Sequence, residues 1–503
     1  MKIWMFVFNN CSRDARVLKE AKCLVKQGHE VTIHAVWDQT VALYEKRDGF
    51  EIVRVTKDPV HYKIARGVKS AVKFVFLLIE LFIRLTKQII KFLLGILLKP
   101  IIAVVTFLGL LIIKIFNIKA KRAENVSLKK KILPISRLFP YIKFFFRNKY
   151  TALKSFLKNK AKSFESATGK IITMLFMPLH RPLCFIDFYL RCYKLSKKSQ
   201  ADVYHAHDLN TLPVAWLCAR RYKKKLVYDS HELYVERNKK HKIMPKFIVK
   251  KIESFFLRKV DRVITVSDSI QEELQKRYKI NNVTVVLNAP EKITHNESNL
   301  SLRNYANING SKIILYLGNI AFGRGIEKLV VSMQFIEHAT LVMMGKVDTN
   351  YKLKIIDLSS QFKVDQKIVF LEPVSSEVVS NYAASADIGV VPIENVCLSY
   401  YYCLPNKLFE NIMAGIPVAG SYFPELKRVI EGYEIGKTFN PDDPKDIAKA
   451  INEILTDKES YIKYRKNTEK AAQIYNWENE SKKLVNLYKS LELLDDKRGS
   501  SSN

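Results

Sequence analysis

The sequence predicts an α/β fold with two doubly wound domains that face a cleft, the first of them interrupted by a basic, hydrophobic helical insertion. Short apolar runs alternate with amphipathic helical windows along both halves of the chain, which is typical of parallel sheets covered by helices. A polar, Asn- and Ser-rich segment over residues 288–311 separates the two alternating series. The excess positive charge is concentrated in residues 61–200.

In the first half, the pattern predicts strands and helices in alternation. Gly28 is a natural stop for the first helix, and Ser267 offers N-cap chemistry to the last one. The predicted strands cover residues 2–8, 31–36, 51–55, 201–206, 226–228, 262–266 and 283–287. The predicted helices cover residues 13–27, 211–221 and 245–259, with a further helix starting at 267.

A second alternating series follows the linker. Its predicted strands cover residues 313–317, 340–344, 368–370 and 388–391. Its predicted helices cover residues 326–335, 351–361, 376–385, 404–413, 444–454, 459–474 and 477–494. The last helix has one apolar face, formed by Leu484, Leu487, Leu491 and Leu494, and a disordered tail is expected from Asp495.

The composition excludes several classes of protein. The chain has 503 residues, 48% of them hydrophobic and 11% aromatic, so it is neither disordered nor fibrous. Its seven cysteines are odd in number and form no C-x-x-C pair, which argues against a disulfide scaffold or a zinc site and favours a reducing compartment. The first ten residues lack the apolar length and cleavage site of a secretory signal.

The insertion combines charge with apolar runs. Residues 61–200 hold 29 Lys and Arg against four acids, a net +25 of the chain's +34. Residues 74–83, 89–98 and 101–113 are strongly apolar, yet a spanning helix needs about 20 such residues. We therefore expect helices that lie in the headgroup plane of an anionic membrane, with a tight membrane hairpin around residues 95–100 as an alternative.

Two other interpretations of the insertion stay open. One is a soluble helical subdomain with a solvated basic face. The other is a nucleic-acid-binding segment, although its aromatic residues lie inside aliphatic runs and no recognition module is present, so we expect no nucleic acid as a partner. The membrane surface is the favoured interpretation.

The segment from Leu404 to Val418 carries the strongest local signal. A proline near a helix start leaves backbone N–H groups free to bind an anion, and Asn406 and Lys407 lie at that point. Glu410 follows one turn later, where its carboxylate can accept hydrogen bonds from ribose hydroxyls. A plain capped helix leading to a buried strand is the alternative interpretation.

A glycine-bearing loop lies between a predicted strand and helix in the second half, over residues 317–325. Gly318 and Asn319 allow the backbone to approach a phosphate, and Arg324 can donate two hydrogen bonds to that phosphate. The spacing matches neither a dinucleotide fingerprint nor a Walker motif.

Two histidine-plus-acid clusters follow strands of the first half, at residues 205–208 and 229–232. Carboxyl ends of parallel strands are the usual ligand-binding edge of such a sheet. His231 can hydrogen-bond a sugar hydroxyl or polarise a reacting centre. A metal site formed by His205, His207, His231 and an acid is weakly supported, because no tight ligand spacing occurs on one helix.

Together these segments resemble the GT-B glycosyltransferases, specifically glycosyltransferase family 4 (glycosyl transferases group 1). The matching segments, in the family's order, are residues 14–31, 201–236, 318–329, 381–393, 404–418 and 439–447. The resemblance implies two facing Rossmann-like domains, with a last helix that crosses back to the first. It also implies a nucleotide-sugar donor, most commonly a UDP-sugar, no cofactor or metal, and retention of anomeric configuration.

The resemblance assigns roles to individual residues. Glu410 is similar to the ribose-binding glutamate and Arg324 to the cation that neutralises the diphosphate, while Lys407 and Leu408 supply helix-end contacts and His231 is similar to the active-site histidine. The donor side also includes Gly318, Asn319 and Asn406. The acceptor side comprises Arg13, Asp14, His207, Asp208 and Glu232.

Two positions depart from the family pattern. Tyr402 stands where a second glutamate is common, and Asn319 where an arginine often follows the loop glycine. The first departure leaves the identity of the sugar open. The second leaves Arg324 and Lys407 as the expected phosphate cations.

We therefore expect a membrane-associated glycosyltransferase on the cytoplasmic face of the cell membrane, peripheral or monotopic, that uses a lipid-linked or polysaccharide acceptor. A GT-B-type nucleotide-sugar epimerase and an inactive membrane adaptor of the same fold are the alternatives. The expected N-terminal Rossmann-like domain covers residues 1–60 and 201–290, interrupted by the insertion 61–200. The C-terminal domain covers 291–476, and 477–503 form the returning helix and disordered tail.

Overall fold

The structure is a computed structural model that describes residues 1–119, 135–238, 245–292, 301–306, 308 and 310–500. By its internal contacts the chain divides into two units, Met1–Lys57 with Phe185–Asn503, and Asp58–Cys184. The first unit contains two parallel sheets, and the second is helical. The α/β fold class predicted from the alternating pattern is confirmed.

The first sheet has eight strands in the order β3-β4-β2-β1-β5-β6-β7-β8, parallel except for β3 against β4. Residues that lie far apart along the chain are neighbours in this sheet, because β1 pairs directly with β5 across the insertion. The strands are β1 (Lys2–Phe6), β2 (Glu30–Val36), β3 (Tyr44–Arg47), β4 (Phe50–Val55), β5 (Val203–His207), β6 (Lys225–Ser230), β7 (Arg262–Thr265) and β8 (Val283–Val285).

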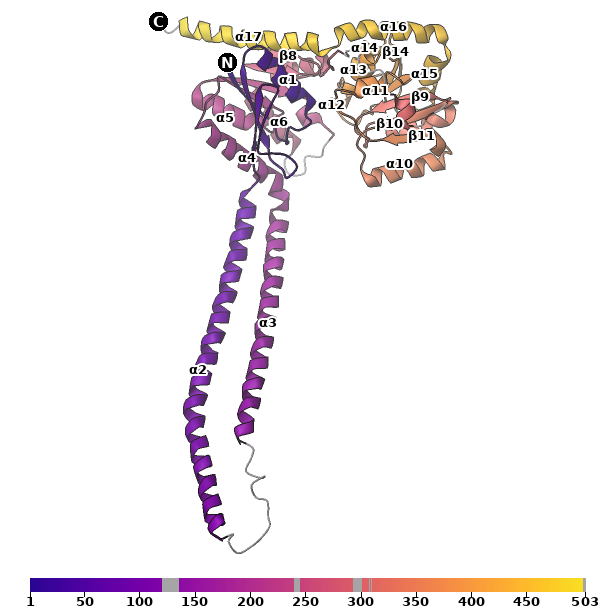
Figure 1. Cartoon of the computed structure of the whole chain (residues 1–503). Helices are drawn as coiled ribbons and strands as arrows, with labels where there is room; N and C mark the ends of the chain where they lie inside the picture. The colour runs from indigo at the N-terminus through magenta and orange to yellow at the C-terminus, as the bar shows by residue number, and fades with distance from the viewer. Residues whose placement is uncertain (120–134, 239–244, 293–300, 307, 309, 501–503) are drawn as a thin grey trace. The chain divides into compact units, whose positions relative to one another are not determined.

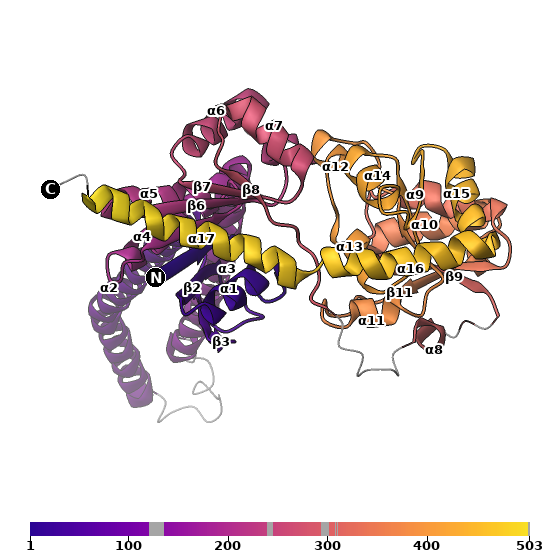
Figure 2. The same cartoon turned by 90° about the horizontal axis from the view of Figure 1, so that it is seen from above.

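Helices cover both faces of this sheet (Figures 1 and 2). One apolar core lies under α4 (His180–Ser196), α5 (Leu212–Tyr222), α6 (Lys246–Leu257) and α7 (Asp268–Tyr278). The other core lies under α1 (Ala15–Lys26) and α17 (Trp477–Ser500). The predicted apolar residues Leu484, Leu487 and Leu491 of α17 are buried in this second core, so the last helix does return to the first sheet.

The second sheet has six parallel strands in the order β11-β10-β9-β12-β13-β14. These strands are β9 (Lys312–Leu317), β10 (Ala339–Met344), β11 (Ile368–Leu371), β12 (Ile388–Val391), β13 (Val418–Ser421) and β14 (Gly436–Phe439). The helices of this half are α8 (Leu302–Ala306), α9 (Ile326–Ser332), α10 (Thr349–Gln361), α11 (Val379–Ala383), α12 (Leu398–Tyr401), α13 (Asn406–Met413), α14 (Pro424–Ile430), α15 (Pro444–Thr456) and α16 (Lys458–Ile474).

Three expectations about segment boundaries need correction. The helical unit spans Asp58–Cys184 instead of 61–200, because the later part of α4 packs into the first core through Phe188 and Cys192. The tail expected to be disordered from Asp495 continues as helix to Ser500, and residues 501–503 lie outside the described part. The expected linker includes the short helix α8, although much of it also lies outside the described residues.

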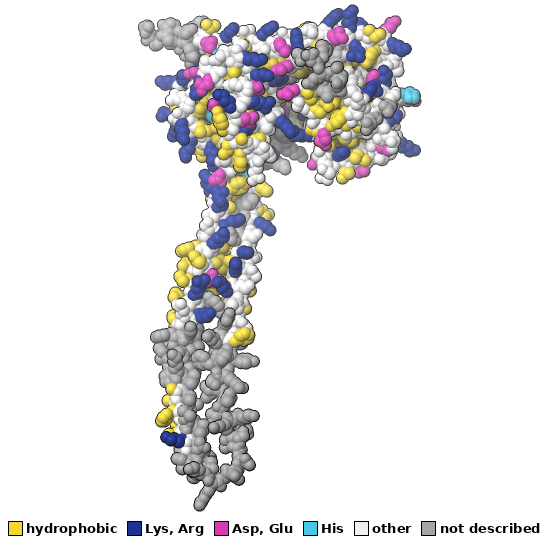
Figure 3. All heavy atoms as spheres, viewed as in Figure 1, with side chains coloured by type: hydrophobic (Ala, Val, Ile, Leu, Met, Phe, Trp, Pro, Cys, Tyr) yellow, Lys and Arg dark blue, Asp and Glu magenta, His cyan; other side chains and the backbone are white. Residues whose placement is uncertain are grey.

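The helical unit consists mainly of α2 (Val60–Lys119) and α3 (Ile135–Phe176), which lie side by side (Figures 1 and 2). The tight turn considered around residues 95–100 is absent, since α2 continues through them as helix. Hydrophobic and basic side chains are interspersed along the described part of this unit (Figure 3). Among the described residues, no helix has both the length and the apolar character needed to cross a membrane.

Candidate active site

A cleft of about 1000 Å³ lies at the carboxyl edge of the first sheet and is lined by residues from both sheet-containing halves. Parallel strands place their following loops at the carboxyl edge of their own sheet. The loops after β1 and β6 of the first sheet and the loop after β9 of the second sheet therefore contribute to the cleft. The predicted site residues among its lining are Arg13, Asp14, His231, Glu232, Arg324 and Asn406. The other predicted residues are not part of this lining: His207, Asp208, Gly318, Asn319, Lys407, Leu408 and Glu410.

The loop after β9 is built around glycines in the left-handed region. Gly318 has a φ of +103°, and Gly325, the N-cap of α9, has a φ of +73°. A Cβ on Gly325 would come within 1.5 Å of the carbonyl oxygen of Pro392, so only glycine fits there. This turn places Arg324 over the Tyr400 ring, with 4.6 Å between the guanidinium carbon and the ring centroid.

The N-terminus of α13 brings a lysine beside that loop. Pro405 is the N-cap, Asn406 is exposed, and Leu408 is fully buried in the apolar core below. Lys407 is also buried, and among the described atoms its Nζ has no hydrogen-bond partner. Burial, together with the nearby Arg324 cation, lowers the pKa of Lys407 well below its usual value. Arg324 and Lys407 therefore lie where the negative charge of a bound ligand would compensate the positive charge of both side chains.

Glu410 lies one turn further along α13 and is partly buried. Burial raises the pKa of its carboxyl to about 7, against the opposing effects of Lys407 and Lys19. Lys19 comes from α1 in the other half and donates to the Ala289 carbonyl oxygen at 2.6 Å. Sequence reasoning missed Lys19, because a lysine on an amphipathic helix is normally a surface residue.

His231 is the partly exposed member of the histidine clusters. Its Nε2 lies 3.2 Å from Oδ2 of Asp229 and 3.2 Å from Nδ1 of His207, and its Nδ1 lies 3.9 Å from Oδ2 of Asp208. Burial alone disfavours a charged ring, but the Asp229 and Asp208 carboxylates outweigh it and raise the pKa of His231 to about 10. The two predicted clusters are therefore in contact.

A buried polar network continues from Asp229 to α1. Arg16 donates from Nε to Oδ2 of Asp229 at 2.7 Å and from a terminal nitrogen to Oδ1 at 2.9 Å. Its Nε also lies 3.1 Å from the carboxylate of Glu20. His205 is fully buried, with its Nδ1 2.9 Å from the hydroxyl of Tyr488 on α17. Arg16 and Glu20 were not identified from the sequence. Charged residues on the apolar face of a predicted helix are a pattern that could have indicated them.

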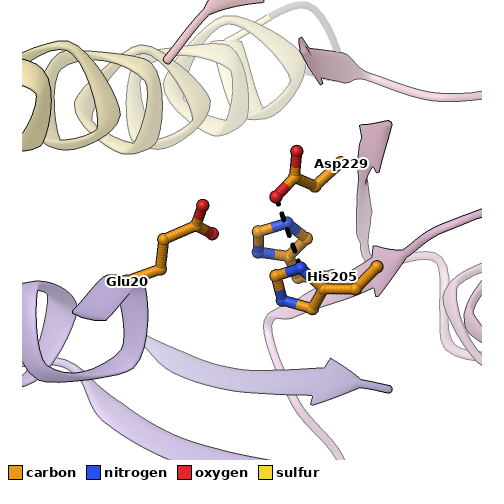
Figure 4. Close-up of side chains that lie close together, drawn as sticks. Glu20, His205 and Asp229 are labelled. Carbon is orange, nitrogen blue, oxygen red and sulfur yellow. Dashed lines mark ion pairs between the residues drawn. The ribbon is translucent and has the colours of Figure 1, made fainter. Parts of the chain in front are cut away.

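Four of these residues have the composition of a metal site: Glu20, His205, His207 and Asp229. In Figure 4, Glu20 extends from its helix toward His205 and Asp229, which come from strands. One candidate ligand atom from each of the four lies within 4.8 Å of the others. Both oxygens of Asp229 also accept hydrogen bonds from Arg16, whose guanidinium compensates the charge of this carboxylate.

Two family models match the chain: Glycosyltransferase Family 4 over residues 158–289, and Glycosyl transferases group 1 over residues 300–472. An uncharacterized glycosyltransferase of Methanocaldococcus jannaschii is 31% identical over 250 residues, which is 45% of this chain. The matched region spans 60% of that relative's length.

Solved structures share the architecture. Sucrose-phosphate synthase of Thermosynechococcus elongatus has a TM-score of 0.65 at 16% identity, with 98% of this chain and 100% of that chain covered. HepE of Anabaena in complex with UDP-glucose has a TM-score of 0.59 at 10% identity, with 97% and 100% covered. At such identities the likeness shows the fold alone, which is the GT-B arrangement of two Rossmann-like domains.

Proposed function

Because the chain belongs to the glycosyltransferases of GT-B fold and family 4 type, we propose that it transfers a sugar from a nucleotide-sugar to an acceptor in the cleft. The observation that carries this proposal is the pair of cations Arg324 and Lys407. Lys407 is buried, and among the described atoms its ammonium lacks a hydrogen-bond partner. A diphosphate would supply the negative charge that compensates both side chains.

In the proposed reaction, the bond between the anomeric carbon and the diphosphate oxygen breaks, and the acceptor hydroxyl oxygen bonds to that carbon. The hydroxyl proton passes to the departing diphosphate. Arg324, Lys407 and the free N–H groups at the start of α13 stabilise the developing charge. If entry and departure occur on the same face of the sugar, the anomeric configuration is retained and no protein nucleophile is needed.

For the donor we propose a UDP-sugar. The similar HepE structure contains UDP-glucose, which supports this choice. Glu410, on the α13 helix that begins at Asn406, is the proposed acceptor of ribose hydrogen bonds. Because two side-chain cations are available for the diphosphate, we also propose that no metal takes part, and we expect activity to persist in EDTA.

We further propose that the helical unit binds an anionic membrane on its cytoplasmic face and brings the enzyme to a lipid-linked or polysaccharide acceptor. Large apolar side chains of α2 are exposed, among them Phe74 at 60%, Leu77 at 61% and Phe82 at 67%. Exposed Lys69 and Lys73 precede them on the same helix. Apolar and basic side chains together favour the headgroup region of an anionic bilayer.

The reaction is tested with membranes that contain the full chain or its Glu410→Gln variant, incubated with a panel of labelled nucleotide-sugars. We expect label from one donor to enter the lipid-extractable or polymer fraction, and we expect the variant to lose this transfer. Release of an isomerised sugar without transfer would instead indicate an epimerase. If no donor reacts although the acceptor pool is shown to be intact, the result would indicate that the protein is a catalytically inactive adaptor.

Membrane binding is tested by flotation of the full chain with vesicles of phosphatidylcholine alone or mixed with phosphatidylglycerol. We expect binding to the anionic vesicles that falls with salt and is weakened when Phe74, Leu77 and Phe82 are all changed to Gln. Ile462→Gln, at an exposed apolar position of α16, serves as the matched control. Equal flotation of the triple variant and the control would contradict the proposal.

A further inference from the structure

We infer that Glu20, His205, His207 and Asp229 form a binding site for one divalent transition-metal ion of the zinc type, buried behind the cleft. The ion has a structural role and touches no substrate. The inference therefore goes beyond the proposed function and does not depend on it. It also leaves the diphosphate to the two side-chain cations described above.

The first observation is that four potential ligand atoms converge at one place. One such atom from each side chain lies within 4.8 Å of the others, and all four side chains are fully buried. Ligands that lie about 2.1 Å from a tetrahedral zinc ion are about 3.4 Å apart, so these atoms need to close by little more than about 1 Å. In Figure 4, Glu20 extends toward His205 and Asp229 from the opposite side of this space.

The second observation is that atoms suited to bind an ion lack a partner. Among the described atoms, both carboxylate oxygens of Glu20 and Nε2 of both His205 and His207 are buried without a hydrogen bond. Nε of Arg16 lies 3.1 Å from Glu20, but its N–H donates to Asp229. Native proteins seldom leave buried polar atoms unpaired, so three such side chains around one space indicate a bound ligand.

The third observation is that the opposite nitrogen of each ring is held by a neighbour, as is usual for metal-binding histidines. Nδ1 of His205 lies 2.9 Å from the hydroxyl of Tyr488, and Nδ1 of His207 lies 3.3 Å from Oδ2 of Asp229. Oδ1 of Asp229 accepts a hydrogen bond from Arg16, and a carboxylate oxygen has a second acceptor position. Both Nε2 atoms and Oδ1 can therefore bind an ion without breaking these contacts.

The donor atoms indicate the kind of ion. Two imidazole nitrogens and two carboxylate oxygens suit zinc and neighbouring first-row ions, whereas calcium and magnesium prefer oxygen ligands alone. The absence of a C-x-x-C pair argues against a zinc site made of cysteines, but it does not bear on this set of ligands. Four protein ligands also leave no open position for a substrate, which is typical of a structural site.

The placement of the ligands explains what the ion does. Glu20 lies on α1, the two histidines on β5 and Asp229 on β6, so the site joins chain segments from both sides of the helical unit 58–184. One ion thus links the two parts of a domain that is discontinuous in sequence. Complete burial keeps a chelator away from the ion in the folded protein, which agrees with the expected activity in EDTA.

The test is the metal content of the full chain, purified without a histidine tag, dialysed against EDTA and measured by mass spectrometry of the elements. We expect about one zinc ion per wild-type chain and at least about tenfold less in Glu20→Gln, which keeps the size of the side chain but removes an anionic ligand. The matched control is His180→Gln, because His180 and His61 form another close histidine pair, 3.0 Å apart. This control should keep the ion.

Cobalt provides a second readout, because its absorption reports the geometry of the site. The full chain produced in zinc-depleted medium with Co²⁺ should show the visible absorption of tetrahedral Co²⁺. Glu20→Gln should lack this absorption, and His180→Gln should retain it. If Glu20→Gln fails to fold, the metal content and the cobalt spectrum of the wild-type chain decide.

A wild-type chain that carries no metal from either medium would overturn the inference. It would indicate that a proton shared between Glu20 and a histidine satisfies these atoms instead. Equal metal content in the wild type and Glu20→Gln, or an ion that EDTA removes from the folded chain, would place the ion elsewhere and also overturn it. No sugar donor is used in these measurements, so their outcome is separate from that of the transfer assay.

Discussion

The Nζ of Lys407 lies 3.6 Å from the centroid of the Tyr316 ring, and both side chains are buried. Tyr316 belongs to β9 and Lys407 to the first turn of α13, so the contact joins the strand before the glycine loop to a helix that follows much later in the chain. The face of the ring stabilises a cation that lacks a hydrogen-bond partner among the described atoms. This contact keeps the ammonium in place before a ligand arrives.

We predict that Lys407→Met lowers sugar transfer by about 100- to 1000-fold, the usual loss when one electrostatic contact to a developing charge is removed. The melting temperature should stay level or rise, because the variant removes a buried polar nitrogen that has no hydrogen-bond partner among the described atoms. The measurements are kcat and calorimetric melting, with the exposed α15 variant Lys449→Met as the control. Lost activity together with a lowered melting temperature would indicate a structural role instead.

Glu410 should make nucleotide binding depend on pH. Its pKa is raised to about 7 by burial, so the carboxylate that accepts ribose hydrogen bonds becomes populated as the pH rises through 7. We predict that the affinity for UDP increases between pH 6 and 8, and that Glu410→Gln binds more weakly with a flat profile. Isothermal titration calorimetry across this range checks the prediction, and an identical slope in the variant would refute it.

His34 should limit stability in acid. It is fully buried on β2 beside Trp4, with ring centroids 4.1 Å apart, and burial lowers its pKa to about 3. The unfolded chain takes up a proton below about 6.5 and the folded chain does not, so stability is full above pH 6.5 and falls toward pH 3. The loss amounts to about 1.4 kcal/mol per pH unit in this window.

The variant that tests this is His34→Leu, whose side chain carries no titratable group. We expect its melting temperature, relative to that of the wild-type protein, to rise as the pH falls from 7 to 5. Calorimetry at both pH values measures the difference. A constant gap between the two proteins would show that His34 does not titrate on unfolding.

Gly325 should tolerate substitution much less than Gly28. Both have positive φ angles, +73° and +80°, but a Cβ on Gly28 meets nothing within 4 Å, whereas one on Gly325 meets the Pro392 carbonyl oxygen at 1.5 Å. Gly28→Ala should cost about 1 kcal/mol from backbone strain alone. Gly325→Ala should cost more and also reduce transfer, because the backbone beside Arg324 must move.

The melting temperatures and kcat values of these two alanine variants separate the effect of the contact with Pro392 from the effect of backbone strain. Strain occurs at both positions, whereas the contact occurs only at Gly325. Equal losses of stability in both would mean that the loop can relax around the added methyl group. Unchanged transfer in Gly325→Ala would mean that Arg324 keeps its place despite the change.

The strands of both sheets were largely predictable because their side chains are buried on both faces and form near-continuous apolar runs. The exception in the first sheet is β3, which sequence reasoning missed. Its residues Tyr44–Arg47 are mostly polar, and it is an antiparallel edge strand paired only with β4. An edge strand with solvent on one side lacks the periodicity by which strands are recognised.

The candidate site was predictable only in part. Histidine and acid clusters after strands, a glycine loop and a helix start with a lysine are local patterns, so His231, Arg324 and Lys407 could be named as candidates from the sequence. Arg16 lies 213 positions from Asp229 along the chain, and no local pattern connects them. Lys19 and Glu20 lie on the same helix as Arg16, and none of the three was named as a candidate from the sequence.

The sequence by itself determined most of the order of helices and strands, the two α/β halves and the concentration of positive charge, because hydrophobic periodicity and charge are local properties of the chain. Only the tertiary structure decided which charges are buried and which groups face them. The placement of Asp229 between Arg16 and His231 depends on strand pairing and on the packing of α1 against the sheet. Protonation follows from burial and from neighbours across the chain, so the chemistry of His231 emerges only in the folded protein.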